Sequence, residues 1–276
     1  MLRERLAAAL VLIPLLVAAL FYLPQWAWAV LMGVVVLLAA HEWARLATFD
    51  IGTERLYLVL TALLLAAAYR LLETGAGLGW WLAGLATAFW LVIAPLWLAT
   101  GFVGQGRLLR AVVGWLLLLP PWVATLELRL IGPGLTLFAL GLIWLADSAA
   151  YFTGHAFGRH KLAPRISPGK TWEGVAGGVG AAALLAWVVA ATAPNFLLAG
   201  RTVAVASFVL ACASVAAISV VGDLFESHIK RLKGVKDSSH LIPGHGGVLD
   251  RIDSLTSALP VFLLMTLLVN RLGSQP

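Results

Sequence analysis

Residues 202–222 read TVAVASFVLACASVAAISVVG, a stretch without a charged side chain, and Asp223 follows it directly. An α-helix rises about 1.5 Å per residue, so a helix of this length crosses a hydrocarbon layer roughly 30 Å thick. Such long runs of Ala and Val differ from the short, alternating strands of a membrane β-barrel. Because lipid cannot pair the polar groups of the backbone, the stretch is predicted to be a transmembrane helix.

Comparable apolar runs recur along the whole chain of 276 residues, which is 61% hydrophobic and 12% charged. This composition excludes a soluble protein. Spans are predicted at about 6–23, 26–44, 56–72, 78–100, 108–128, 133–153, 174–193, 202–222 and 254–270. The predicted fold is therefore an all-α, polytopic bundle of about nine transmembrane helices.

The N-terminus also has features of a secretory signal, because MLRERL is basic and residues 27–29, AWA, resemble a cleavage site. Its apolar part is long for a signal peptide, however, and many further spans follow it. We therefore expect this segment to remain as the first transmembrane helix.

Positive charge is distributed unevenly between the two ends of the predicted spans. If the N-terminus is cytoplasmic and the chain crosses nine times, all Lys and Arg residues fall on the cytoplasmic side except Arg70, Arg129, Arg201 and Arg271. This bias follows the positive-inside rule and predicts a cytoplasmic N-terminus. Topology thus accounts for the net charge of +6, and nucleic acid is not an expected partner.

The two halves of the chain differ in their connections. Residues 1–130 are predicted to form transmembrane helices joined by short loops. Residues 131–276 combine further spans with two long polar loops, 154–174 and 226–254, on the same predicted side of the membrane. We expect a functional site where these two cytoplasmic loops face each other.

Four aspartates lie in or beside these loops. Asp147 and Asp223 are predicted at the cytoplasmic ends of spans, where the helix dipole disfavours a negative charge and a carboxylate usually has a partner. Asp250 and Asp253 are three residues apart and share a helix face, although an acidic first turn of the last helix is the simpler explanation of that pair. Oxygen ligands suit Mg²⁺, or Mn²⁺ as the alternative, rather than zinc.

Cations and glycines lie between these aspartates. A basic cluster contains Lys230, Arg231, Lys233 and Lys236, which on its own would be explained as an anchor to anionic lipid. The glycines beside His245, among them Gly246 and Gly247, permit a backbone nest whose N–H groups bind an anion. A divalent ion, cations and such a nest together indicate a polyphosphate site.

The first polar loop contains SPGKT at 167–171, which is reminiscent of a Walker A motif. Residue 164 is Pro164 where that motif needs glycine, and no strand is predicted before it, so we reject a P-loop. Ser167, Lys170 and Thr171 are still expected to bind phosphate, because Lys170 is charged and a helix is predicted to begin next to Thr171.

Two further patterns have simpler explanations. Gly174 and Gly178 form a GxxxG pattern, which lets helices approach closely, and we expect that contact within the chain rather than between protomers. His41 and Glu42 lie at the end of a span and do not form an HExxH motif, because position 45 is Arg45. We interpret them as an interfacial polar cluster.

The second polar loop resembles the signature of phosphatidate cytidylyltransferase, also called CDP-diacylglycerol synthase. The residues that carry the resemblance are Ser227, Lys230, Arg231, Lys236, Asp237, the PGHGG stretch at 243–247, Asp250, Arg251 and Asp253. Upstream, Asp147-x-x-Ala150-Tyr151 and residues 167–174 are similar to bacterial members, although Gly169 stands where a second lysine is expected. Residues 1–130 carry little resemblance beyond hydrophobicity.

The resemblance implies a Mg²⁺-dependent reaction of CTP with phosphatidate in the bacterial cytoplasmic membrane, at a site facing the cytoplasm, by a homodimer. Asp223 and Asp250 are then expected to hold the metal, with Asp147 and Asp253 as further ligands. The residues expected to bind phosphates or act in catalysis are Ser167, Lys170, Thr171, Lys230, Arg231, Lys236 and Asp237. His245, Gly246 and Gly247 would shape the nest, and Arg251 would pair with an acid or a phosphate.

Two rival functions remain. A proton- or cation-coupled transporter predicts polar residues spread through the centres of several spans, whereas here they gather at one side. A CDP-alcohol phosphotransferase would carry a DGxxAR signature, which this sequence lacks.

Overall fold

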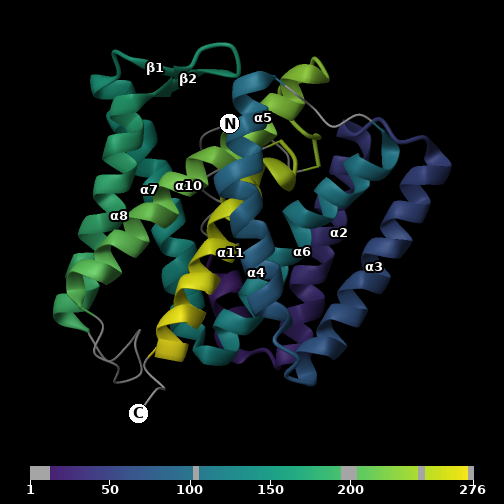
Figure 1. Cartoon of the computed structure of the whole chain (residues 1–276), viewed down its shortest axis with the longest axis horizontal. Coiled ribbons are helices and arrows are strands. Elements are labelled where there is room, and N and C mark those ends of the chain that lie inside the picture. Colours follow the sequence, from purple (N-terminus) through teal and green to yellow (C-terminus); the bar gives the residue numbers. More distant parts are fainter. Residues whose placement is uncertain (1–12, 102–105, 194–203, 242–245, 273–276) are drawn as a thin grey trace.

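The computed structural model describes residues 13–101, 106–193, 204–241 and 246–272 (Figure 1). Its helices are α2 (Gln25–Leu46), α3 (Ile51–Glu73), α4 (Leu78–Ala88), α5 (Ala94–Thr100), α6 (Arg107–Ile131), α7 (Pro133–Phe157), α8 (Trp172–Thr192), α10 (Val205–Leu232) and α11 (Leu249–Leu272). A π-helical turn, η1 (Phe89–Ile93), joins α4 to α5, so that Leu78–Thr100 forms one continuous span.

The predicted all-α, polytopic bundle is confirmed. Within the described residues, 8 helices are long and apolar enough to cross a membrane, and they correspond to the predicted spans from 26–44 onward. The first predicted span, 6–23, is described only from residue 13, where Ile13–Tyr22 forms a shorter apolar helix. Residues 1–12 lie outside the described part of the chain.

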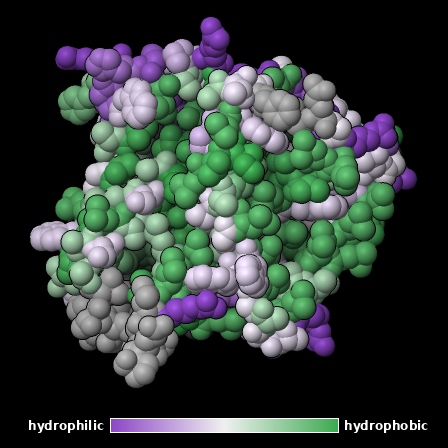
Figure 2. Space-filling model, viewed as in Figure 1, coloured by the Kyte–Doolittle hydropathy of each residue, from purple (hydrophilic) through white to green (hydrophobic). Residues whose placement is uncertain are grey.

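Large hydrophobic side chains are exposed around the bundle. Leu63, Leu85 and Trp187 each expose more than half of their surface, at 60%, 59% and 55%. Figure 2 shows a broad hydrophobic surface, with hydrophilic residues gathered mainly near its upper and lower edges. A soluble protein rarely exposes so large a continuous apolar surface, whereas a protein surrounded by lipid does.

Helix α11 is central to the bundle. It packs against α10 on one side and against α4, α6, α7 and α2 on others. Gly222 on α10 allows one of these contacts, because a Cβ atom there would lie 2.7 Å from the carbonyl oxygen of Asp253 on α11. The last helix therefore connects the two halves of the chain.

The GxxxG pattern brings α8 against α7 within the chain. A Cβ atom at Gly178 would lie 2.7 Å from the carbonyl oxygen of Ala146, and one at Gly174 would lie 2.8 Å from that of Ala150. Larger side chains at these two positions would push the helices apart. The expected contact within the chain is thus observed.

A small β-hairpin joins α7 to α8, where the sequence predicted only a loop. Strand β1 (Lys161–Ala163) pairs antiparallel with β2 (Ser167–Thr171), which contains the SPGKT stretch. The hydroxyl group of Thr171 then caps α8, accepting a hydrogen bond from the N–H group of Gly174 at 3.1 Å. The hairpin projects from one end of the bundle, at the upper left of Figure 1.

The prediction that Asp147 and Asp223 lie at the ends of helices is wrong. Helix α7 continues to Phe157 and α10 continues to Leu232, so both aspartates lie inside helices. For α10 the cause is visible in the packing, because Leu224 and Phe225 beyond the aspartate are buried against neighbouring helices. The unfavourable dipole at a helix C-terminus therefore does not act on either side chain.

Candidate functional site

The two polar loops meet at one end of the bundle (Figure 1). The ammonium nitrogen of Lys170, on strand β2, lies 2.5 Å from Oδ2 of Asp223 on α10. Arg231, near the end of α10, donates a hydrogen bond from Nε to the carbonyl oxygen of Ile166 in the hairpin, at 3.3 Å. Segments about sixty residues apart in sequence thus form a single polar surface.

Asp250, at the start of α11, is held by several donors. Its Oδ1 atom lies 2.5 Å from the ammonium nitrogen of Lys230, which is also 3.0 Å from Oε1 of Glu226. Its Oδ2 atom accepts hydrogen bonds from the hydroxyl and the N–H group of Ser238, both at 2.9 Å, and from the N–H group of Gly247 at 2.8 Å. This carboxylate fixes the loop between α10 and α11.

Glu42, near the end of α2, is almost completely buried, with 1% of its surface exposed. Its carboxylate accepts a hydrogen bond from the hydroxyl group of Ser239 at 2.6 Å, and it shares the single hydroxyl proton of Ser238, 2.9 Å away, with Asp250. It also accepts from the N–H groups of Val248 and Leu249, at 2.9 and 2.7 Å, and so caps α11 from another helix. Glu42 thus belongs to a polar cluster, as the sequence indicated, and this cluster holds the loop before α11.

The predicted anion nest is directed toward carboxylates of the protein itself. The N–H group of Gly247 donates to Asp250, and the two N–H groups that follow donate to Glu42. Gly246 has a φ of +83°, and a Cβ atom there would lie 2.7 Å from Oδ2 of Asp250, so both its conformation and its surroundings favour glycine. His245 lies outside the described residues. Contact of Gly246 and Gly247 with phosphate stays a prediction.

A second set of carboxylates lies close to Asp250, and together with it forms what we call the acidic group: Asp147, Asp223, Glu226, Asp250 and Asp253. Asp223 of α10 is close enough to Asp147 of α7 and to Asp253 of α11 for their charges to interact. Glu226, one turn beyond Asp223, interacts in the same way with Asp253 and Asp250. Two lysines, Lys170 and Lys230, form ion pairs with this acidic group.

The remaining predicted site residues are more exposed. Lys236 and Asp237 lie on the surface of the loop after α10. Arg251 is also exposed at the start of α11, and no ion pair links it to an acid among the described residues. Ser167, at the beginning of β2, is partly buried in the hairpin.

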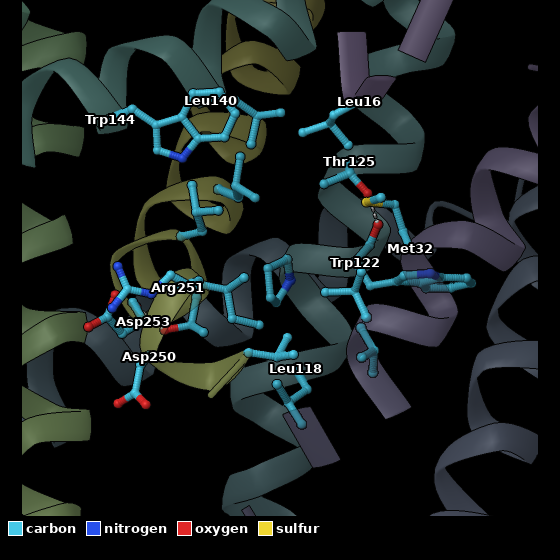
Figure 3. A pocket seen from close by; sticks show the side chains of 18 of the residues that line it. Leu16, Met32, Leu118, Trp122, Thr125, Leu140, Trp144, Asp250, Arg251 and Asp253 are labelled. Atoms are coloured by element: carbon cyan, nitrogen blue, oxygen red, sulfur yellow. Dashed lines mark hydrogen bonds between the residues drawn. The ribbon is translucent and has the colours of Figure 1, made fainter. Parts of the chain in front are cut away.

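An apolar cavity of about 720 Å³ adjoins the acidic group. Figure 3 shows Asp250, Arg251 and Asp253 together at one side, while Leu16, Met32, Trp122 and Thr125 lie across from them. The volume falls within the range of about 300 to 1,000 Å³ that is usual for small-molecule sites. The site is therefore amphipathic, with a charged part and an apolar part.

Comparison with known proteins agrees with this geometry. The sequence profile of the cytidylyltransferase family matches residues 3–269, nearly the whole chain. The chain belongs to the cytidylyltransferase family. The resemblance found in the sequence is thereby confirmed, and the match includes both the helices and the two loops that meet at the site.

Two members of the cytidylyltransferase family are similar over nearly their full length, and a third over about half of it. The chain is 43% identical to phosphatidate cytidylyltransferase from Pseudomonas aeruginosa over 270 residues, which cover 95% of this chain and 96% of the relative. It is 38% identical to the enzyme of that name from Haemophilus influenzae, covering 95% and 97% of the two chains. For the Thermotoga maritima enzyme of that name, a 43% identity covers 47% of this chain and 48% of the relative.

The acidic side chains (Asp147, Asp223, Glu226, Asp250 and Asp253) offer oxygen atoms of the kind that Mg²⁺ prefers as ligands, although they do not form a ready-made cluster. Within the described ranges, no three His, Cys, Asp or Glu side chains are close enough together to hold a metal ion as they stand. Five carboxylates nevertheless gather around two lysines, and Oε2 of Glu226 is buried without a hydrogen-bond partner. This excess of carboxylate oxygen fits a hard divalent cation such as Mg²⁺.

From the sequence, Glu42 was not assigned to the site, and Glu226 was not considered. Glu42 lies at the end of a long apolar span, and a carboxylate in such a position usually has a partner. The same argument identified Asp147 and Asp223. Glu226 lies four residues before Lys230, a spacing that places the two side chains next to each other on a helix. Both signals were therefore present in the sequence.

Proposed function

We propose that this protein joins CTP and phosphatidate to form CDP-diacylglycerol and pyrophosphate. Full-length relatives carry the name of this activity, and one structural observation supports it most strongly. A group of acids paired with lysines adjoins an apolar cavity at one end of a membrane bundle. The charged part suits a nucleoside triphosphate, and the cavity suits a lipid.

The reaction requires electrostatic stabilisation rather than a protein nucleophile. The phosphate group of phosphatidate is ionised at neutral pH, and one of its oxygens forms a bond to the α-phosphorus of CTP. The bond from that phosphorus to the bridging oxygen of the β-phosphate breaks, and its electron pair leaves with pyrophosphate. No proton is removed from the attacking group, so the main barrier is the repulsion between two anions.

The residues that would hold Mg²⁺, or Mn²⁺, are Asp223 and Asp250, with Asp147 and Asp253 as further ligands and Glu226 added by the structure. When bound, the ion supplies positive charge to the phosphates and to the leaving pyrophosphate. Asp250 already accepts hydrogen bonds from several donors. Asp223 has fewer partners: it pairs with Lys170 and accepts one longer hydrogen bond, of 3.3 Å, from the hydroxyl group of Ser227. Asp223 is therefore the more accessible of the two principal ligands.

Lys170 and Lys230 would bind phosphate oxygens of CTP. Each ammonium group has three hydrogen-bond donors, so it can hold its aspartate and a phosphate at the same time. Arg231, which contacts the hairpin, and Lys236, exposed in the loop after α10, would stabilise the pyrophosphate. Thr171 would have a positioning role, because its hydroxyl group is already engaged in capping α8.

We place the protein in the cytoplasmic membrane of a bacterium, with the site facing the cytoplasm. The support is the positive-inside distribution of Lys and Arg, together with the position of both polar loops at one end of the bundle. A homodimer stays a prediction that rests on the resemblance alone.

The direct test uses the purified protein in detergent with labelled CTP and phosphatidate. The label should enter a lipid only when Mg²⁺ is present, and one pyrophosphate should be released for each lipid formed. Glu73→Gln is a suitable control, because among the described residues this exposed acid pairs only with Arg70, across one turn of α3. Incorporation that continues unchanged in excess EDTA would refute the metal dependence, and no labelled lipid under any condition would refute the activity.

A further inference from the structure

Ser238, in the loop after α10, connects two carboxylates that come from different halves of the chain. Its hydroxyl oxygen lies 2.9 Å from Oε2 of Glu42 on α2 and 2.9 Å from Oδ2 of Asp250 on α11. We propose that Glu42 and Ser238 are positioning residues for Asp250: they hold Oδ2 in place, so that Oδ1 is the oxygen that binds the divalent ion. This inference rests on the metal dependence in the proposed function and adds to it the orientation of one ligand and the residues that set it.

The two carboxylate oxygens of Asp250 have different surroundings. Three donors point to Oδ2: the hydroxyl and N–H groups of Ser238, both at 2.9 Å, and the N–H group of Gly247 at 2.8 Å. A carboxylate oxygen has about two lone-pair positions, so Oδ2 has none left for an ion. Among the described residues, Oδ1 has one partner, the ammonium group of Lys230 at 2.5 Å. One position on Oδ1 therefore stays open.

Lys230 has a second partner that would keep it paired when an ion binds to Oδ1. Its ammonium nitrogen lies 3.0 Å from Oε1 of Glu226, one turn earlier on α10. An ion on Oδ1 would repel the ammonium group, which can move toward Glu226 without becoming an unpaired buried charge. Binding through one oxygen also suits Mg²⁺, because its octahedral shell has little room for the narrow angle between two oxygens of one carboxylate.

Glu42 determines where Ser238 can lie. Its buried carboxylate also accepts hydrogen bonds from the N–H groups of Val248 and Leu249, so the beginning of α11 and Ser238 are attached to the same group. The hydroxyl group has one proton for its two negatively charged neighbours. Without that proton, the carboxylates of Glu42 and Asp250 would repel each other across a buried space. Ser238 thus keeps Asp250 at its place beside the rest of the acidic group.

The first test measures Mn²⁺ affinity by electron paramagnetic resonance, without substrates. Ser238→Ala should weaken Mn²⁺ binding about tenfold, since the loss of a hydrogen-bond partner of a metal ligand usually costs this much. Ser239→Ala is the matched control, because its hydroxyl group donates to Glu42 at 2.6 Å and makes no hydrogen bond to Asp250. Its Mn²⁺ affinity should equal that of the wild type. Wild-type affinity in Ser238→Ala, or an equal loss in both variants, would refute the role of Ser238.

The second test separates positioning from stability. In Ser238→Ala, the Mg²⁺ concentration that gives half-maximal activity should rise about tenfold, while kcat at saturating Mg²⁺ and the KM for phosphatidate stay close to those of the wild type. A merely structural role would instead lower the unfolding midpoint and kcat, and leave the Mg²⁺ requirement unchanged. That second pattern would overturn the proposal.

The closing experiment is a structure of the wild-type protein with Mn²⁺, located by its anomalous scattering. We expect the ion about 2 Å from Oδ1 of Asp250, with Oδ2 still beside the hydroxyl group of Ser238. An ion bound to Oδ2, or to both oxygens, would refute this proposal and leave the metal dependence intact. A wild-type protein that binds no Mn²⁺ and is active without divalent ions would refute the metal dependence, and this proposal with it.

Discussion

The two halves of the chain contribute to the site in different ways. The C-terminal half supplies the acids and lysines on the hairpin, α7, α10 and α11, and its residues carry the recognisable signature. The N-terminal half supplies few charged groups, yet Glu42 of α2 holds the loop before α11, and Met32 and Leu118 line the cavity. The side chains proposed for the chemistry and the residues that hold them in place therefore come from different halves of the chain.

The largest expected effect is in the C-terminal half. Asp223→Asn keeps the size of the side chain but removes the charge that pairs with Lys170 and would bind the metal. We expect the rate of CDP-diacylglycerol formation to fall by at least about 100-fold to 1,000-fold, while the elution volume in detergent stays that of the wild type. A rate near that of the wild type would remove Asp223 from the metal site.

The next largest effect concerns the support from the N-terminal half. Glu42→Ala leaves the buried N–H groups of Val248 and Leu249 without their acceptor, which costs about 1–3 kcal/mol for each group left unsatisfied. Both the midpoint of thermal unfolding and kcat should fall, although Glu42 touches neither proposed substrate. Glu54→Gln is the matched control, because this acid on α3 pairs with His41 nearer the surface. Wild-type stability in Glu42→Ala would show that the two halves are not coupled in this way.

The smallest effect concerns packing inside the C-terminal half. Gly178→Ala places a methyl group against the backbone of α7, and overpacking of this kind costs about 1–3 kcal/mol. Gly180→Ala is the control, since a Cβ atom at Gly180 would meet nothing within 4 Å. A lower unfolding midpoint in the first variant and an unchanged one in the second would support the close contact of α7 and α8. Equal midpoints in both would contradict it.

Much of the fold could be predicted from the sequence, because hydropathy reports directly on what a lipid environment requires. The spans and the gathering of polar residues at one end follow from that physics. The extension of α10 beyond Asp223 could not be predicted, since it depends on Phe225 packing against Phe89 and Trp90 of η1, more than a hundred residues earlier in the chain. The hairpin was also missed, because the Pro and Gly of SPGKT disfavour a strand in isolation.

The sequence predicted which charged residues form the candidate site, but it did not predict which of them pair with one another. The acids and bases were identified because charged residues are costly near a membrane. Glu42 was not assigned its role, because its partners lie about 200 residues later and only the folded chain brings them together. No local pattern in the sequence indicates a hydrogen bond between segments that are so far apart.

Binding of Mn²⁺ to the purified protein tests the central claim most directly, because it requires no turnover. Electron paramagnetic resonance should detect Mn²⁺ bound to the wild type and to Glu73→Gln, and displacement by excess Mg²⁺. The account predicts that Asp223→Asn, folded as judged by its elution volume, loses this binding. Equal Mn²⁺ affinity in Asp223→Asn and in the wild type would contradict the claim that these acids hold the ion.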